Sequence, residues 1–335
     1  MKILIIKFGA LGDVVRTSYV LKGLHEKYKD VKIDWLTSNS AFDLLRFNPY
    51  INTLATKDFL LSKIKKTSYD LVISLDDEME VLEILKEIDT KSIFGAYLND
   101  SGDRTYSKDS GLWFDMGLLS IHGKAKADQM KKANHLEHNE IFERMLDIEI
   151  TSPCFYNSSI LEKQIADRFT HNTFKIGLNS SSGGRWESKK LPITETVKLI
   201  NLLLNITVDD KIIEVYLLGG EDEKDRNQQI IQDVKSKSVI DTGADNSLLE
   251  FSAIIKNMDY LISSDSLALH LGIAQGVKNL SFYAPTSAAE IGTFGLGVKV
   301  VSTSNEYCNY QKDSDNSSIT ANKIFHTFKN HIGLD

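Results

Sequence analysis

A carboxylate and two glycines stand where the chain leaves its first apolar run. Residues 9–13 read GALGD, a pattern that matches neither the dinucleotide fingerprint nor the Walker phosphate-binding loop. Gly9 and Gly12 permit a tight turn and the close approach of a ligand. Asp13 stands at the start of the next helix, where it can be a helix N-cap or a catalytic base at the end of a strand. The residues leave both roles open.

A second loop whose residues could bind a ligand spans residues 179–190, NSSSGGRWESKK. It combines five small hydroxyl or amide side chains, two glycines and three cations, directly after an expected strand. Such a loop can offer backbone N–H groups and positive charge to a diphosphate. A solvated surface loop is the alternative, and the position at a strand end favours the binding role.

A third motif, SSDSLALH at residues 263–270, ends a strand and begins a helix at Asp265 or Ser266. Helix N-termini attract anions through their free amides and dipole. His270 follows Ser266 by four residues and so lies on the same helix face. A packed, hydrogen-bonded histidine is the more common role for such a residue.

The elements that must position these loops are strands alternating with helices. Short apolar runs separated by amphipathic stretches predict two mostly parallel sheets in series. Ligands bind beyond the carboxyl ends of strands in such sheets, so the two domains are expected to face each other across a cleft. A hinge is expected at residues 151–159. The expected strands are residues 3–8, 31–36, 70–75, 92–97, 174–179, 212–220, 238–241, 260–265, 279–284 and 298–303.

The bulk composition limits the class of protein. A chain of 335 residues suits two domains, and 42% hydrophobic with 25% charged residues is typical of a soluble globular protein. The net charge of −7 is evenly spread, which argues against nucleic acid as a partner. Cys154 and Cys308 are too far apart in sequence to suggest a disulfide framework or a cysteine-rich zinc site. The apolar run at the N-terminus is too short for a signal peptide or a membrane span, so a cytoplasmic location is expected.

Taken together, these motifs resemble the family-9 glycosyltransferases, the ADP-heptose:lipopolysaccharide heptosyltransferases and their relatives. The resemblance spans nearly the whole chain and rests on residues 3–24, on the Gly-Gly-Glu of 219–221 and above all on SSDSLALHLGIAQGVKNLSFYAPT, residues 263–286. It implies the GT-B fold, an α/β architecture of two Rossmann-like domains. Residues 1–155 would bind the acceptor, and residues 170–335 would bind the nucleotide sugar.

The resemblance also implies roles for particular residues. Asp13 would be the general base, in a loop whose Gly9 and Gly12 shape the acceptor pocket. Lys189 and Lys190 are the candidates for the catalytic lysine that reaches the diphosphate. Glu221 would hold the adenosine ribose. The other expected donor contacts are Ser180, Ser181, Arg185, Asp265, Ser266 and His270.

Two departures from the family pattern concern the donor site and the C-terminal segment. Leu267 stands where family members usually have a glycine, which leaves the donor sugar and its base open. Cys308 is the one cysteine in a segment that often carries more of them in the family, and it is assigned no role.

The implied reaction is an inverting transfer of a heptose or related sugar from an ADP-sugar to a hydroxyl of a lipopolysaccharide or lipooligosaccharide core, or of another glycan. No cofactor besides the donor and no metal are expected, since no His/Asp/Glu cluster has metal-ligand spacing. Alternatives are a UDP-sugar transferase, an epimerase or a non-catalytic nucleotide-sugar-binding protein. An acidic chain can still contact the inner membrane through a local patch. The lysine-rich residues 122–135 are the candidate for that contact or for acceptor phosphates, with a solvated helix face as the default.

Overall fold

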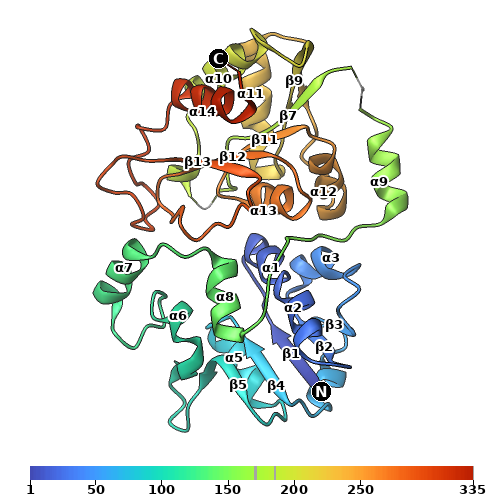
Figure 1. Ribbon diagram of the computed structural model, residues 1–335, viewed down its shortest axis with the longest axis vertical. Coiled ribbons are helices and arrows are strands. Elements are labelled where there is room, and N and C mark those ends of the chain that lie inside the picture. Colours follow the sequence, from blue (N-terminus) through green and yellow to red (C-terminus); the bar gives the residue numbers. More distant parts are fainter. Residues whose placement is uncertain (170–171, 185, 335) are drawn as a thin grey trace. The chain divides into compact units, whose positions relative to one another are not determined.

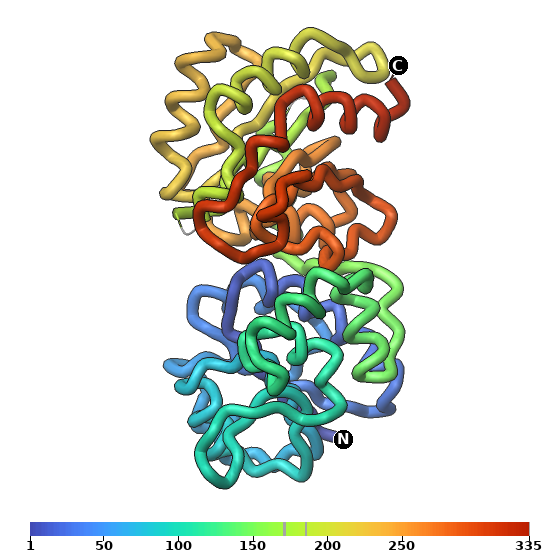
Figure 2. The backbone as a smooth tube through the Cα atoms, turned by 90° about the vertical axis from the view of Figure 1, so that its left-hand side faces the viewer, coloured from blue at the N-terminus to red at the C-terminus, as the bar shows by residue number. Residues whose placement is uncertain are grey.

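The chain forms two α/β units, which span Met1–Tyr156 and Asn157–Asp335 (Figure 1). The computed structural model describes residues 1–169, 172–184 and 186–334. Figure 2 traces the backbone of the same units from another side, the first in blue to green and the second in green to red. The division falls inside residues 151–159, where the sequence suggested a hinge.

The N-terminal unit is built on a six-stranded sheet in the order β3-β2-β1-β4-β5-β6. All neighbouring strands pair in parallel except β5 and β6, which pair antiparallel. The central strand, β1, is apolar after its first residue because helices cover both faces of such a sheet, and Ile3, Leu4, Ile5 and Ile6 are fully buried. The strands are β1 (Lys2–Ile6), β2 (Lys32–Leu36), β3 (Thr53–Ala55), β4 (Leu71–Ser74), β5 (Ile93–Leu98) and β6 (Arg104–Tyr106).

The C-terminal unit repeats this arrangement in the order β10-β9-β7-β11-β12-β13, with all of these strands parallel. A short strand, β8, adds an antiparallel edge to β9. The strands are β7 (Phe174–Asn179), β8 (Thr207–Val208), β9 (Lys211–Leu217), β10 (Val239–Asp241), β11 (Tyr260–Ser264), β12 (Asn279–Tyr283) and β13 (Gly297–Val301).

Both sheets follow the Rossmann strand order, in which the connections reverse direction beside the first strand. The reversal lies between β1 and β4 in the first sheet and between β7 and β11 in the second. Loops leaving the carboxyl ends of these two strands part to opposite faces and leave space for a ligand. The three motifs singled out from the sequence follow β1, β7 and β11.

Helices cover the faces of both sheets (Figure 1). In the N-terminal unit the α-helices are α1 (Leu11–Thr17), α2 (Val20–Lys27), α3 (Phe42–Leu45), α4 (Leu61–Lys65), α5 (Met79–Lys86), α6 (Gly111–Phe114), α7 (Lys124–Ala133) and α8 (His138–Leu146). In the C-terminal unit they are α9 (Ser159–Ala166), α10 (Ile193–Leu204), α11 (Lys224–Val234), α12 (Leu248–Lys256), α13 (Leu267–Ala274) and α14 (Ala321–Ile332). Short 3-10 helices are η1 (Asn39–Ala41), η2 (Lys108–Ser110), η3 (Glu187–Lys189) and η4 (Glu221–Glu223). None of the helices in the described ranges is long and apolar enough to cross a membrane.

Each strand expected from the sequence has a counterpart in the structure. The strands missed are β3, β6 and β8, which have three, three and two residues. Runs this short carry too few side chains to show a period of two. All three lie at or near sheet edges, where pairing with a neighbour defines the strand.

A buried ion pair crosses the reversal point of the N-terminal sheet. Lys7 directly follows β1, and its ammonium contacts the carboxylate of Asp76, which follows β4. The other oxygen of Asp76 accepts the N–H of Phe8, while the Lys7 carbonyl accepts hydrogen bonds from Thr37 and Trp35. Burial raises the pKa of the Asp76 carboxyl, against the opposite pull of Lys7. The pair therefore fixes the backbone that leads into the GALGD loop.

We expect Asp76→Asn to lower the free energy of unfolding of the N-terminal unit by about 3 to 5 kcal/mol, because the Lys7 ammonium would stay buried without its counter-charge. Urea denaturation measures the loss. The matched control is Glu87→Gln, whose pair with Lys65 lies nearer the surface and should change stability by less than about 1 kcal/mol. Equal losses in the two variants would contradict a special role for the buried pair.

Candidate functional site

Asp13 lies in the first turn of α1 and is not the N-cap of that helix. The helix begins at Leu11, and Ala10 occupies the N-cap position. The N-cap role considered from the sequence is therefore wrong, because the N-cap lies three residues earlier than the pattern suggested. The Asp13 carboxylate pairs with Arg16 at 2.8 Å, and the Asp13 side chain is 37% exposed. This carboxylate is therefore partly open to solvent.

The two glycines before Asp13 differ in their surroundings. A Cβ atom at Gly9 would meet no atom within 4 Å, so the space beside this residue is open. Gly12 is buried inside α1. Arg16, the partner of Asp13, lies with its guanidinium 5.5 Å from the ring centre of Trp113, which restrains the pair from the far side.

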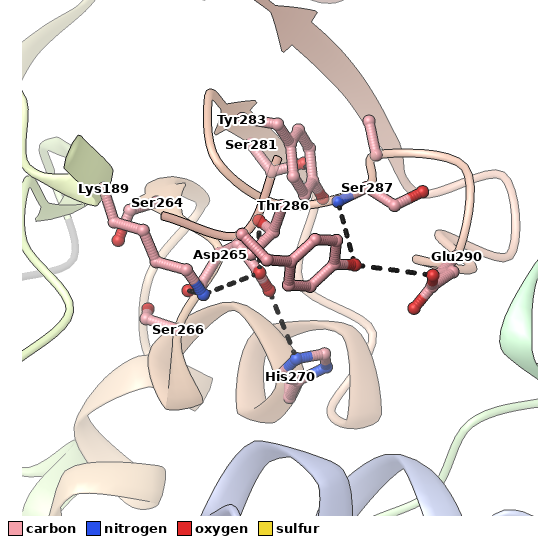
Figure 3. A network of polar contacts seen from close by, with 12 residues as sticks. Lys189, Ser264, Asp265, Ser266, His270, Ser281, Tyr283, Thr286, Ser287 and Glu290 are labelled. Carbon is pink, nitrogen blue, oxygen red and sulfur yellow. Dashed lines mark hydrogen bonds and ion pairs between the residues drawn. The ribbon is translucent and has the colours of Figure 1, made fainter. Parts of the chain in front are cut away.

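The C-terminal sheet carries a second Lys–Asp pair at its own reversal point (Figure 3). Lys189 ends η3, in the loop after β7, and Asp265 directly follows β11. The Lys189 ammonium lies 2.8 Å from the Oδ2 atom of Asp265 and donates a second hydrogen bond, 3.0 Å, to the Asp265 carbonyl. Both side chains are largely buried, 14% and 13% exposed. These two residues, both expected from the sequence, are brought together by the fold.

Asp265 is the centre of a larger polar network. Thr286, in the turn after β12, donates to the Oδ2 atom of Asp265 at 2.7 Å, and the Nε2 atom of His270 lies 3.7 Å from Oδ1. Burial alone would raise the pKa of the Asp265 carboxyl, but Lys189 and His270 outweigh it and hold this pKa well below its usual range. The carboxylate is therefore charged at any physiological pH.

The turn that carries Thr286 is itself held by two partly buried tyrosines. The Tyr310 hydroxyl accepts the N–H of Ser287 at 3.3 Å and donates to the buried Glu290 at 3.4 Å. The Tyr307 hydroxyl accepts the N–H of Ala288 at 2.8 Å. Cys308, between the two tyrosines, is buried and donates its backbone N–H to the Ala284 carbonyl. The segment around Cys308 thus supports the site from behind.

The three serines after β7 differ in their hydrogen bonds. Ser180 accepts hydrogen bonds from Arg226 at 3.2 and 3.3 Å, and the Ser181 carbonyl accepts the hydroxyl of Ser264 at 2.5 Å. The buried hydroxyl of Ser182 has no hydrogen-bond partner among the described residues. A buried hydroxyl without a partner costs about 1 to 3 kcal/mol, so Ser182 is placed to gain from a ligand.

Two carboxylates close the glycine turn of the same loop. Glu223 accepts the N–H of Gly183 at 2.8 Å, and Asp222 accepts the N–H of Gly184 at 2.9 Å. Arg185, expected among the donor contacts, lies outside the described residues. The amides of Gly183 and Gly184 are therefore bound within the protein.

Two expected site residues stand outside this network. Lys190 pairs with Glu187 at 2.5 Å, on the more exposed side of the loop. Glu221 has a 74% exposed side chain and a loose contact of 3.4 Å with Lys224. The buried carboxylate of the same turn is Glu223. The structure thus separates Lys189 from its neighbour Lys190.

The start of α13 is arranged as the sequence suggested. Ser266 occupies the N-cap position, and its hydroxyl lies 3.1 Å from that of Ser263 and 3.4 Å from the amide of Asn179. Leu267 is the first helical residue and is half-buried. His270 is buried one turn further along. Within the described ranges, no three His, Cys, Asp or Glu side chains are grouped as metal ligands.

Sequence reasoning missed three contributors to this network: Thr286, Glu223 and Arg226. Thr286 ends the motif of residues 263–286. Its position after β12, the strand beside β11, could have indicated that it lies near Asp265. The sequence pattern assigned no role to the side chains of Glu223 and Arg226. Only the folded loop places their side chains on Gly183 and Ser180.

The sequence is similar to those of known proteins. Residues 60–320 match the model of glycosyltransferase family 9 (heptosyltransferase). Lipopolysaccharide heptosyltransferase 1 of Campylobacter coli is 22% identical over 299 residues, which are 85% of this chain and 84% of that protein.

Two solved structures share the fold over nearly their whole length. The glycosyl transferase family 9 protein from Veillonella parvula has a TM-score of 0.74 and 16% identity, with 99% of this chain and 97% of that chain covered. The ADP-heptose lipopolysaccharide heptosyltransferase II of E. coli has a TM-score of 0.70 and 14% identity, with 99% and 98% covered. The likeness confirms the fold class expected from the sequence, a GT-B architecture of two Rossmann-like domains.

The low pKa of Asp265 leads to a test by pH. An acid with a lowered pKa in the folded state stabilises the fold above its unfolded pKa, about 3.9 for Asp, and loses that contribution as pH falls toward the folded value. We expect the stability difference between wild type and Asp265→Asn to be constant at neutral pH and to shrink below about pH 4. Urea denaturation across this range measures it. Asp128→Asn, at an exposed pair with Lys124, is the control. If the stability difference between wild type and Asp265→Asn did not change with pH, the lowered pKa of Asp265 would be contradicted.

Proposed function

Because the chain belongs to glycosyltransferase family 9, the heptosyltransferase family, we propose that it transfers a heptose or related sugar from an ADP-linked donor to a hydroxyl of a lipopolysaccharide or lipooligosaccharide core, or of another glycan. Family membership makes the chain a glycosyltransferase that uses a nucleotide-sugar donor. The observation that carries the proposal is the buried Lys189–Asp265 pair at the reversal point of the second sheet, because a departing diphosphate needs positive charge at such a point.

Lys189 is the proposed contact to the leaving group. A lysine ammonium has three N–H donors, and the hydrogen bonds to the carboxylate and carbonyl of Asp265 use two of them. The third can reach a phosphate oxygen while Asp265 keeps the side chain in place. Charge held in a preformed position stabilises the developing negative charge without reorganisation at the moment of reaction.

Hydroxyl and amide groups around Lys189 complete the proposed donor site. The buried Ser182 hydroxyl can donate to the diphosphate, and so can Ser266 and the free amides at the start of α13. Ser180 and Ser181 shape the loop, and His270 supports Asp265 from the helix. Lys190 adds positive charge to the same loop, and Glu221, an exposed carboxylate, would bind the ribose hydroxyls of adenosine.

Asp13 is the proposed general base in the N-terminal unit, which binds the acceptor. Its carboxylate would take the proton of the acceptor hydroxyl as that oxygen attacks the anomeric carbon. The bond to the diphosphate breaks in the same step, so a single displacement inverts the configuration. The ion pair with Arg16 stabilises the carboxylate in its charged form, which a base must have.

The donor assignment predicts different effects for two adjacent lysines. Lys189→Gln should weaken ADP binding and slow sugar transfer at least about tenfold, because charge-assisted hydrogen bonds contribute roughly 1.5 to 3 kcal/mol. Lys190→Gln, whose lysine pairs with Glu187 at the surface, should change both less than about threefold. Thermal shift with ADP and with UDP measures binding. Equal shifts with the two nucleotides would favour the UDP-sugar alternative, and equal effects of the two variants would contradict the role of Lys189.

The base assignment predicts that Asp13→Asn lowers the rate of transfer about 10²- to 10⁴-fold, the usual contribution of a general base. ADP affinity should not change. Acceptor-dependent release of ADP from ADP-heptose, with heptose-free lipopolysaccharide core as acceptor, measures the rate. Asp43→Asn is the matched control, since Asp43 also forms an i,i+3 pair with an arginine in the first turn of a helix. Wild-type transfer by Asp13→Asn would contradict the mechanism.

A further inference from the structure

The loop before α7 holds two apolar side chains in water. Leu118 is 93% exposed and Ile121 is 71% exposed. Among the large apolar side chains of the described residues, none is more exposed than Leu118. Transferring such side chains out of water is favourable, so a surface that covers Leu118 and Ile121 would gain binding energy.

The loop is ordered in a way that keeps these side chains outside. Leu119, between them, packs against the buried cluster of Leu82, Tyr106 and Phe114. The N–H of Ile121 donates to the Tyr106 hydroxyl at 3.1 Å, and backbone hydrogen bonds close successive turns at residues 117, 120 and 123. Because Leu119 packs inward, Leu118 and Ile121 remain on the outside of the loop.

Positive charge follows directly after the apolar tip. Residues 117–133, called here the docking segment, contain four lysines and one acidic residue, Asp128, in a chain whose net charge is −7. Lys126 and Lys132 on α7 are exposed. Figure 1 shows α7 at the outer edge of the N-terminal unit, beyond α8 and away from the sheet. Only Ala127 of this helix is buried.

We propose that the docking segment binds an anionic lipid surface. Leu118 and Ile121 enter the boundary between headgroups and acyl chains, and the lysines of α7 contact the negative headgroups. Apolar insertion and electrostatic attraction act together in such binding. A polar protein surface would not gain from Leu118 and Ile121, and an apolar one would not gain from the lysines. The proposal goes beyond the transfer reaction, because lipid binding requires neither donor nor acceptor.

The test is sedimentation of the full chain with vesicles of phosphatidylcholine, with and without phosphatidylglycerol. Wild type should bind the mixed vesicles, bind phosphatidylcholine alone weakly, and lose affinity as salt rises. Leu118→Ser with Ile121→Ser should weaken binding roughly tenfold or more. Lys126→Gln with Lys132→Gln should weaken it about 25-fold, since each lysine near an anionic surface contributes about fivefold.

Matched controls separate this site from general surface properties. Ile160→Ser with Ile212→Ser removes two side chains of similar exposure, 71% and 59%, and Lys29→Gln with Lys237→Gln removes two other exposed lysines. Both controls should bind as wild type does. The proposal is overturned if wild type does not bind the mixed vesicles, or if the controls lose as much binding as the docking-segment variants. It is also overturned if binding requires lipopolysaccharide in the vesicle, which would assign the segment to the acceptor.

Discussion

A Lys–Asp pair across the reversal point of each sheet is the interaction on which the rest of the structure depends. Lys7 and Asp76 join the ends of β1 and β4, and Lys189 and Asp265 join the loops after β7 and β11. The two strand pairs are equivalent in the shared strand order. A parallel sheet opens at this point, and an ion pair with backbone hydrogen bonds holds the two diverging loops together.

The two pairs have different consequences because their surroundings differ. Asp76 binds Lys7 and the N–H of Phe8, so that pair fixes the backbone leading to Asp13. Asp265 is joined by Thr286 and lies near His270. The second pair also lies at the start of α13, where the N-terminal amides of a helix can receive an anion. The proposed mechanism uses this difference between the units.

Polar, partly buried side chains of the C-terminal segment support this arrangement. Tyr307 and Tyr310 hold the turn after β12, and Asn316 donates to the carbonyls of Ser188 and Lys190. These bonds fix both sides of the Lys189–Asp265 pair before any ligand arrives. The docking segment is the opposite case, since its apolar side chains are exposed by an anchored neighbour, Leu119. We propose a polar ligand for the first surface and lipid for the second.

The sequence by itself determined the longer strands and their division between two units, because apolar runs and turn residues act locally. It placed Asp13 just after β1, Lys189 after β7 and Asp265 after β11. Only the tertiary structure decided that Lys189, and not Lys190, meets Asp265, 76 residues further along, and that Ala10 rather than Asp13 occupies the N-cap position. Thr286 and Glu223 joined the network in the same way. A pattern identifies the loop, but the pairing of neighbouring strands and the path of each turn decide which side chains meet.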